Sequence, residues 1–413
     1  MSSKPNLLIV GNFNRKDYLD LFKGSQNYFD FFFLEFAAPQ EIQNSYYQTY
    51  GKAIFWGDFK TADDLLQLIK PQKVIFFFIE SYYHVVLNLA CKVAGISTYH
   101  LDHGLRDINI NTRLETYFIQ QKGTPVHVKQ VQKLKQLLPR LRARLFLHNS
   151  VERLPPPEAA FFRHFYKVRS AKHYLATFKA INSPLRVADA YIAFSPKVYE
   201  VHQQQDFLPP GKVVHFTGFL SYDHLADIRP AATARKQILF IDQGLTTRCI
   251  LGWTPERYRL FIAAFTNICL SFGYDLYVKP HPIQPKQEVD CWADRPNVHL
   301  INDKELTAIL PETPLIIGFF STYLLPLMAL PHTTVLTLEN HPVGKLDVSK
   351  SFIEAGVAKP IYDLEELHDI LPNIASLHEQ QLPNKAKFTE EWLYKFDGKS
   401  GERLRDILLR NEL

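Results

Sequence analysis

Three short stretches of the chain combine residue types that could bind and transfer a negatively charged group. The first, Lys279-Pro280-His281-Pro282, follows an apolar run from Leu276 to Val278 that is typical of a buried parallel strand. Each proline restricts the backbone, so His281 would be held in one orientation beside the Lys279 cation. Ligands of open α/β sheets bind where strands end, which makes this stretch a candidate anion site. A structural turn that carries a histidine is the alternative.

The other two stretches offer a candidate general base and a candidate phosphate-binding site. Asp102-His103-Gly104 follows a strand-like run from Thr98 to Leu101, and Gly104 permits a tight turn that would present the Asp102 carboxylate as a general base. His103 is a rival base because imidazole titrates nearer neutrality, and a capping role for Asp102 stays open. Ser321 and Thr322 offer hydroxyls and backbone N–H groups at the start of a predicted helix, either to hold a phosphate or to cap the helix.

Together these residues meet the needs of a glycosyl transfer. Such a reaction requires a base for the acceptor hydroxyl, stabilisation of the departing phosphate and a cradle for the donor. The chain contains no Asp-x-Asp, so we expect no metal ion and no cofactor beyond a nucleotide-sugar co-substrate. It also lacks G-x-G-x-x-G and G-x-x-x-x-G-K-[ST], which counts against dinucleotide oxidoreduction and P-loop chemistry.

Composition sets the broad class. A chain of 413 residues, 46% apolar and 22% charged, suits two globular domains. Its four cysteines are scattered without metal-ligand spacing, which favours a reducing compartment and disfavours a zinc site. The apolar run Leu7–Val10 is too short for a signal peptide, and the longest uncharged apolar stretch, 315–330, is too short to span a membrane. We therefore expect a cytoplasmic protein.

A basic segment, residues 122–146, stands out within a net charge of +5. No acidic residue occurs between Glu115 and Glu152, and apolar residues recur there at helical spacing, with Pro139 expected to kink the helix. Packing on its own domain is one interpretation. Docking of 122–146 to an anionic membrane surface or an acidic polymer is the other, whereas nothing indicates a nucleic-acid partner.

Strand-like and helix-like segments alternate in two blocks. The pattern breaks between Ser221 and Arg235, which predicts a domain boundary. We expect an acceptor-binding domain at 1–225, a donor-binding domain at 226–385, and a segment at 386–413 whose helix, about 388–410, returns to the first domain. Long helices are also expected at about 126–147 and 157–180. Repeated strand–helix alternation implies parallel βαβ units, hence two doubly wound sheets with the site in the cleft between two lobes.

At this point the motifs resemble a known group of enzymes. Asp102-His103-Gly104, Lys279-Pro280-His281-Pro282 and Ser321-Thr322 are similar, in this order, to the acidic-acidic-Gly, His-Pro and Ser/Thr motifs of bacterial sialyltransferases and polysialyltransferases. The stretch Phe240–Leu245 also resembles the strand and loop that open the second lobe in that group. One departure is that His103 occupies the second acidic position.

The resemblance implies an α/β fold of two doubly wound Rossmann-like domains, known as GT-B, and a metal-independent inverting transfer. The donor would be a CMP-linked sialic acid or related keto-sugar, and the acceptor a surface glycan of a capsule or lipopolysaccharide. Asp102 would be the base, and His281 would meet the CMP phosphate. The candidate donor-binding residues are Gln243, Gly244, Lys279, His281, Pro282, Gly318, Ser321 and Thr322.

Several alternatives stay open. The His103-Gly104 pair also resembles the glycerophosphate and ribitol-phosphate polymerases of teichoic-acid and capsule synthesis, which would make His103 the base and the donor CDP-linked. Capsular Kdo transferases resemble the pattern too. A UDP- or GDP-sugar transferase, a nucleotide-sugar 2-epimerase and a non-enzymatic glycan-binding subunit are the remaining possibilities.

Overall fold

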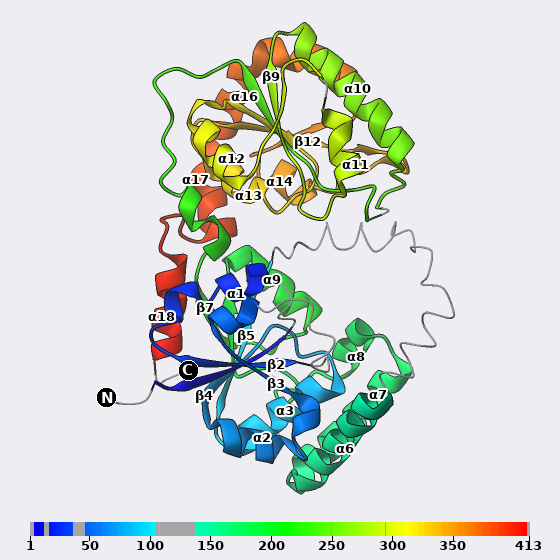
Figure 1. Ribbon diagram of the computed structural model, residues 1–413, viewed down its shortest axis with the longest axis vertical. Coiled ribbons are helices and arrows are strands. Elements are labelled where there is room, and N and C mark those ends of the chain that lie inside the picture. Colours follow the sequence, from blue (N-terminus) through cyan, green and yellow to red (C-terminus); the bar gives the residue numbers. More distant parts are fainter. Residues whose placement is uncertain are drawn as a thin grey trace. The chain divides into compact units, whose positions relative to one another are not determined.

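The computed structural model describes residues 4–11, 16–35, 46–104, 107, 137–248, 250–293 and 295–410. The chain forms two α/β units (Figure 1). One holds the chain up to His103, the part from Thr124 to Asp223 and the C-terminal segment from Lys399, and the other holds mainly His224–Gly398. The two units meet in the sequence at Asp223 and His224, and again at Gly398 and Lys399.

The first unit is built on a parallel sheet of seven strands in the order β3-β2-β1-β4-β5-β6-β7. Strand order runs outward in both directions from β1 and β4, as in a doubly wound fold. The strands are β1 Asn6–Val10, β2 Asp30–Glu35, β3 Gly51–Phe55, β4 Pro71–Phe76, β5 Ser97–Leu101, β6 Ala190–Ala193 and β7 Val213–Phe216.

Helices cover both faces of this sheet, and α2 and α3 lie on the side opposite α1 (Figure 1). Capping residues and a glycine in the sequence explain where the helices α2 and α3 begin and end. The Thr61 side chain caps the start of α2, and Ser81 caps α3, which ends before Gly95 at a φ of +67°. The helices are α1 Lys16–Asp20, α2 Ala62–Ile69, α3 Tyr82–Val93, α6 Leu137–Arg153, α7 Pro156–Ala171, α8 Tyr174–Ala180, α9 Pro196–Gln205 and α18 Ser400–Leu409.

The second unit repeats the plan with six parallel strands in the order β10-β9-β8-β11-β12-β15. These two sheets confirm the expected α/β class with two doubly wound domains. The strands are β8 Gln237–Ile241, β9 Asp275–Lys279, β10 Val298–Leu300, β11 Leu315–Gly318, β12 Thr334–Leu338 and β15 Lys359–Ile361, with a small hairpin of β13 Asn340–His341 and β14 Gly344–Lys345.

The longest helix of the second unit, α10, follows the sequence signals closely. Thr254 caps it, Pro255 opens it, and Gly273 follows its end at a φ of +72°. The helices of this unit are α10 Pro255–Ser271, α11 Lys286–Val289, α12 Asp303–Ile309, α13 Leu324–Ala329, α14 Lys350–Glu354, α15 Leu367–Ile370, α16 Ile374–Gln381 and α17 Lys385–Phe388.

The C-terminal segment packs on the first unit through polar contacts. Asp223 accepts the N–H groups of Ser400 and Gly401 at 3.2 and 3.1 Å, which caps the start of α18. The Lys73 ammonium donates to the Leu408 carbonyl at 2.7 Å, near the other end of that helix. Burial lowers the pKa of Lys73 to about 8, so these carbonyl oxygens compensate a cation that has left water.

Two expected helices are interrupted. The predicted helix 388–410 is wrong as a continuous element, because the chain turns at Tyr394 and Gly398, where φ is +67° and +73°, before α18 begins. The predicted helix 157–180 divides into α7 and α8 because Lys172 takes an extended conformation.

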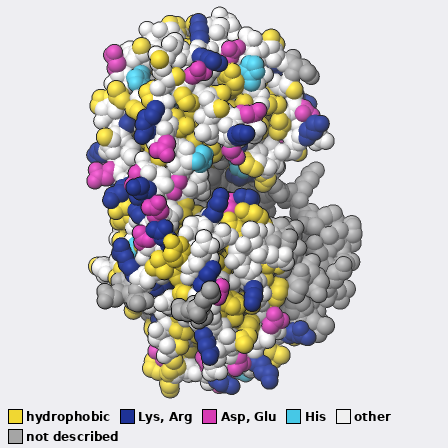
Figure 2. Space-filling view, turned by 60° about the vertical axis from the view of Figure 1, so that its left-hand side comes forward, with side chains coloured by type: hydrophobic (Ala, Val, Ile, Leu, Met, Phe, Trp, Pro, Cys, Tyr) yellow, Lys and Arg dark blue, Asp and Glu magenta, His cyan; other side chains and the backbone are white. Residues whose placement is uncertain are grey.

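The basic segment is only partly described, since residues 122–136 lie outside the described ranges. Pro139 lies next to the undescribed residues, so the expected kink stays a prediction. Within the described ranges no helix is long and apolar enough to cross a bilayer. On the face in Figure 2 the basic and acidic side chains of the described residues are interspersed, so that face carries no single-signed field.

Candidate active site

The donor-binding candidates of the second unit follow three adjacent strands, β9, β8 and β11. Ile241 at the end of β8 pairs with Lys279 on one side and Gly318 on the other. The segments that follow these strands therefore leave the sheet at the same edge. Strand order reverses between β8 and β11, and open α/β sheets bind ligands at such a point. The fold thus gathers the three predicted donor-binding stretches where a nucleotide is expected.

A buried carboxylate, Asp242, organises the loop after β8. Its Oδ1 accepts the N–H groups of Gln243 and Gly244 at 2.7 and 3.3 Å. Its Oδ2 accepts the Tyr258 hydroxyl and, at 2.8 Å, the Gln284 amide. Burial raises the pKa of Asp242, and these donors oppose the rise. Asp242 therefore ties the β8 loop to α10 and to the segment after β9, and acts as a scaffold.

His281 is fixed by the same network. Its backbone N–H donates to Gln284 Oε1 at 2.7 Å, and its Nδ1 accepts the Ile283 N–H at 3.2 Å. Gly244 approaches this segment closely. A Cβ added there would lie 3.2 Å from both the Gln284 and Ile283 side chains, and φ at Gly244 is +63°. Glycine is therefore needed at 244 both for its backbone conformation and for the contact between the two loops.

Arg248, which was not among the predicted site residues, lies beside His281. Its Nη2 is 3.0 Å from His281 Nε2. A guanidinium can only donate hydrogen bonds, whereas a neutral imidazole has one acceptor nitrogen, and Nδ1 already accepts from Ile283. The ring cannot fully accept both donors. The structure thus places a cation and an imidazole side by side in an arrangement that a shared anion would relieve.

Lys279 has an acidic partner. It is 9% exposed, and its Nζ lies 3.2 Å from Asp303 Oδ1 and 5.9 Å from the centre of the Tyr323 ring. The Lys279 side chain therefore links the end of β9 to α12 and to the segment after β11. Its predicted contact with the donor phosphate stays a prediction.

Ser321 and Thr322 lie in the loop before helix α13, and not in its first helical turn. The helix α13 begins at Leu324, and Ser321 Oγ accepts the Tyr323 N–H at 3.3 Å in the preceding turn. Ser321 is buried and Thr322 half-buried. Gly318 ends β11, and a Cβ there would be 3.0 Å from the Ile241 carbonyl oxygen, so this glycine allows close packing of β11 on β8. Pro282 is exposed.

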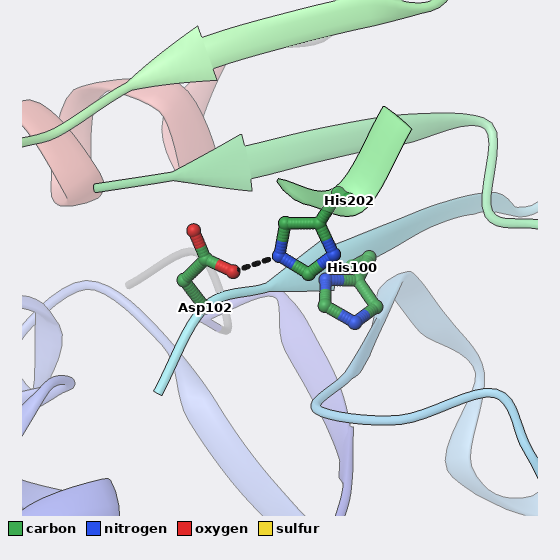
Figure 3. Close-up of side chains that lie close together, drawn as sticks. All are labelled: His100, Asp102 and His202. Carbon is green, nitrogen blue, oxygen red and sulfur yellow. Dashed lines mark hydrogen bonds and ion pairs between the residues drawn. The ribbon is translucent and has the colours of Figure 1, made fainter. Parts of the chain in front are cut away.

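In the first unit, Asp102 immediately follows β5 and is 1% exposed. Its Oδ2 accepts the Phe194 N–H at 3.1 Å, and its Oδ1 accepts a hydrogen bond from Nε2 of His202, a residue of α9 (Figure 3). His202 Nδ1 lies 3.1 Å from Asp206 Oδ2. His103 is half-buried instead, with its ring packed 4.8 Å from Tyr18 between ring centres.

His100, Asp102 and His202 form a candidate metal-ligand group among the described residues, since one ligand atom from each lies within 4.8 Å of the others (Figure 3). Asp102 and His202 share a hydrogen bond within this group, and the His100 ring stacks on Tyr191, with ring centres 4.8 Å apart.

Comparison with solved structures agrees with this fold. The calicheamicin glycosyltransferase CalG4 matches with a TM-score of 0.52 at 10% identity, covering 98% of each chain. A variant of the wall teichoic acid polymerase TagF matches with a TM-score of 0.50 at 12% identity, covering 98% of this chain and 88% of that one. A putative UDP-N-acetylglucosamine 2-epimerase from Listeria monocytogenes gives 0.51 at 11%, covering 98% and 96%.

Two doubly wound domains whose strand ends carry a buried aspartate, a His-Pro segment and a Ser-Thr turn are those of a glycosyltransferase of the GT-B class. Residues 58–340 match the model of the alpha-2,8-polysialyltransferase family, and the chain belongs to that family. It is therefore a transferase that takes a nucleotide-sugar donor and a glycan acceptor. A comparison with curated protein sequences gave no significant match.

The residues missed from the sequence differ in how they could have been found. His202 and Asp206 stand four residues apart, a spacing that places two residues on one face of a helix, but no helix was predicted there. Arg248 reaches His281 only because two loops meet, and no local pattern predicts such a contact. Gln284 follows His281 by three residues in the same loop.

Replacing Gly244 with alanine tests the contact between the two loops. We expect Gly244→Ala to destabilise the protein by about 2–3 kcal/mol, because the positive φ and the crowding against Gln284 add up. Nucleotide affinity should fall as well, since His281 must move. Thermal unfolding and nucleotide titration measure the two effects.

The matched control is Gly211→Ala, whose φ is +75° with nothing within 4 Å of the added Cβ. It should cost about 1–2 kcal/mol through backbone strain alone and leave nucleotide affinity unchanged. Equal nucleotide affinity in the two variants would contradict the role assigned to Gly244.

Proposed function

We propose that this enzyme transfers sialic acid, or a related keto-sugar, from a CMP-linked donor to a surface glycan of a capsule or lipopolysaccharide, by a metal-independent inverting reaction. The observation that carries the proposal is the placement of the three motifs, each of which lies at or just after the end of a parallel strand, at β5, β9 and β11. The acceptor oxygen bonds to the anomeric carbon, its proton passes to Asp102, and the bond to the CMP phosphate breaks with its electron pair leaving on the phosphate.

The donor phosphate is proposed to bind between His281 and Arg248. Their 3.0 Å contact places a guanidinium against an imidazole, and an anion that accepts from both groups would replace it with two charge-assisted hydrogen bonds. Gln243 Oε1 is buried with no hydrogen-bond partner among the described residues, so it retains the capacity to accept from a hydroxyl or amino group of the donor, and not from its phosphate.

A nucleotide panel tests the donor. With CMP at a hundred times its dissociation constant we expect about 2.7 kcal/mol of added stability, seen as a higher melting temperature, and CMP-sialic acid should give at least as much. CDP, UDP and GDP should give less. Stabilisation by UDP or GDP alone would overturn the cytidine assignment and leave the fold and family intact.

Arg248→Ala checks the phosphate contact in the same panel. It should reduce the CMP-dependent stabilisation, whereas Arg259→Ala, at an exposed position of α10, should not. The same CMP response in both variants would remove Arg248 from the site.

The base is assigned to Asp102, with His103 as the rival from the same strand end. Asp102→Asn should lower kcat by about 10²–10⁴, because the amide cannot take the acceptor proton. His103→Gln should lower it less. The opposite order would make His103 the base and would favour a CDP-alditol phosphotransferase. Product analysis separates these reactions, since one adds a sugar without phosphate and the other forms a phosphodiester.

We also propose peripheral contact with an anionic membrane through the basic segment 122–146. In the described part of that segment, α6 exposes Leu141 by 47% and Leu145 by 59%, with Arg142 and Arg144 exposed beside them. An apolar pair one helical turn apart with flanking cations suits an anionic bilayer surface.

Sedimentation with vesicles tests this contact. The protein should bind vesicles containing phosphatidylglycerol and not pure phosphatidylcholine, and the double change Leu141→Ser and Leu145→Ser should weaken binding at least tenfold through lost apolar burial. Leu260→Ser, at a position 67% exposed on α10, is the control. Equal binding to both kinds of vesicle, or unchanged binding by the double variant, would contradict the proposal.

A further inference from the structure

Two tyrosines of the first unit pair at the same edge of the sheet as Asp102. Tyr82 is the first residue of α3, which follows β4 after a short loop, and its ring centre lies 4.5 Å from that of Tyr166 on α7, with 34° between the ring planes. Strands β4 and β5 are parallel neighbours, so the chain leaves both at one edge, and Asp102 follows β5 there. The tyrosine pair therefore belongs to the edge where the acceptor is expected.

The pair is open to solvent on one side. Tyr166 is 47% exposed, whereas Tyr82 is half-buried because its ring also packs on Phe165, with ring centres 6.2 Å apart. Tyrosine offers a large, stiff contact surface with a polar tip, and such side chains are common where proteins bind ligands. The exposed face of the Tyr166 ring is thus available to a ligand, and Tyr82 supports it from behind.

Arg169 adds a charged donor beside the pair. It follows Tyr166 by three residues on α7, a spacing that places both on one face of the helix. Burial raises the pKa of Tyr82, Tyr166 raises it further, and Arg169 opposes the rise, so the guanidinium acts on the pair electrostatically. Arg169 Nη1 donates to the Lys172 carbonyl at 3.0 Å, but its Nε is buried with no hydrogen-bond partner among the described residues.

That unsatisfied donor indicates an anionic ligand. Buried polar groups are nearly always hydrogen-bonded, and charged ones cost most to leave without a partner. A guanidinium fork matches a carboxylate, which can accept two parallel N–H bonds. The local charge favours an anion too, because residues 156–180 contain five Lys or Arg and one acidic residue, Glu158. A carboxylate brought by a ligand would therefore satisfy Arg169.

We propose that Tyr82, Tyr166 and Arg169 form a binding site for an acidic sugar of the acceptor. The sugar ring lies with its C–H face on Tyr166, and its carboxylate accepts from Arg169. A neutral sugar would leave Arg169 without its partner, and a simple anion would leave the tyrosine ring uncovered, so the two features together select a sugar that carries a carboxylate. The inference rests on the proposed function in one respect, that the first unit receives a glycan acceptor.

Calorimetric titration of the intact protein with a sialic acid trimer tests the site without turnover. The trimer should bind at least tenfold more tightly than maltotriose, which has no carboxylate. Tyr166→Ala and Arg169→Gln should each weaken trimer binding about tenfold or more, through loss of the stacked ring and of the charged donor. Tyr166→Phe keeps the ring and should stay within about threefold of the wild type.

Two matched controls come from the same unit. Tyr28 is 43% exposed and lies beside a cation, with Arg405 5.5 Å from its ring centre, but it precedes β2 and so belongs to the opposite edge of the sheet. Arg163 is exposed on α7 and lies 3.5 Å from Glu152. Tyr28→Ala and Arg163→Gln should change trimer affinity by less than about twofold. Losses as large as those of the site variants would show unspecific attraction and overturn the proposal.

Steady-state kinetics separates acceptor binding from a structural role. With CMP-sialic acid as the donor, Tyr166→Ala and Arg169→Gln should raise KM for the trimer about tenfold and leave kcat within about twofold, because neither residue touches the reacting atoms. Tyr166→Phe should restore KM. Stabilisation by CMP should equal that of the wild type in every variant, which shows that the second unit is intact. A lower kcat with unchanged KM would contradict the site.

These outcomes are distinguishable from failure of the proposed function. If CMP stabilises the protein and Asp102→Asn is inactive, but the trimer does not bind or binds all variants equally, the acidic-sugar site fails and the proposed reaction survives. If CMP has no effect, while trimer binding still depends on Tyr166 and Arg169, the donor assignment fails and the acidic-sugar site survives.

Discussion

The parallel register of β8 with its two neighbours is the constraint on which the donor site depends. Because Ile241 pairs with Lys279 and with Gly318, three segments far apart in the sequence start from one line across the sheet. Short connections then suffice to bring His281 and Ser321 to the same edge. A slip of one residue in either pairing would turn the side chains of that strand to the opposite face. Gly318, packed on the Ile241 carbonyl, protects the register on the β11 side.

The two buried aspartates at strand ends differ in how their charge is treated. Asp242 accepts hydrogen bonds from a hydroxyl, an amide and two backbone N–H groups, all of which are neutral donors, and burial raises its pKa. It holds loops together and needs no ionised state to do so. Asp102 instead meets an imidazole that is itself placed against a second carboxylate. The buried carboxylates at the two strand ends therefore have different partners, neutral donors around Asp242 and a titratable imidazole beside Asp102.

The sequence predicted the parts of the fold that depend on local pattern. The strand-like runs Thr98–Leu101 and Leu276–Val278 are local signals, and the structure forms β5 and β9 there. The predicted helix 388–410 failed for a different reason: positive φ at Tyr394 is a conformation that its residue type does not favour, so no propensity argument indicates a break there.

Contacts between loops could not be predicted from the sequence, because no local pattern specifies which loops meet. Arg248 beside His281 depends on the meeting of the β8 and β9 segments, which Gly244 allows and Asp242 enforces. The buried partners of Asp102 are an intermediate case. The spacing of His202 and Asp206 could be read from the sequence, but their contact with Asp102 requires α9 to pack over the end of β5.

His103, which stands where the motif has its second acidic residue, fits its aromatic surroundings. The His103 ring lies among the rings of Tyr18, Phe77 and Phe78, at centre-to-centre distances of 4.8, 5.8 and 4.4 Å. A carboxylate at 103 would lose its hydration against these aromatic rings, and it would stand next to Asp102, where a second negative charge disfavours ionisation of the first. An imidazole packs against the rings and adds no negative charge. The described contacts of the His103 ring are therefore those of a side chain that packs among aromatic rings.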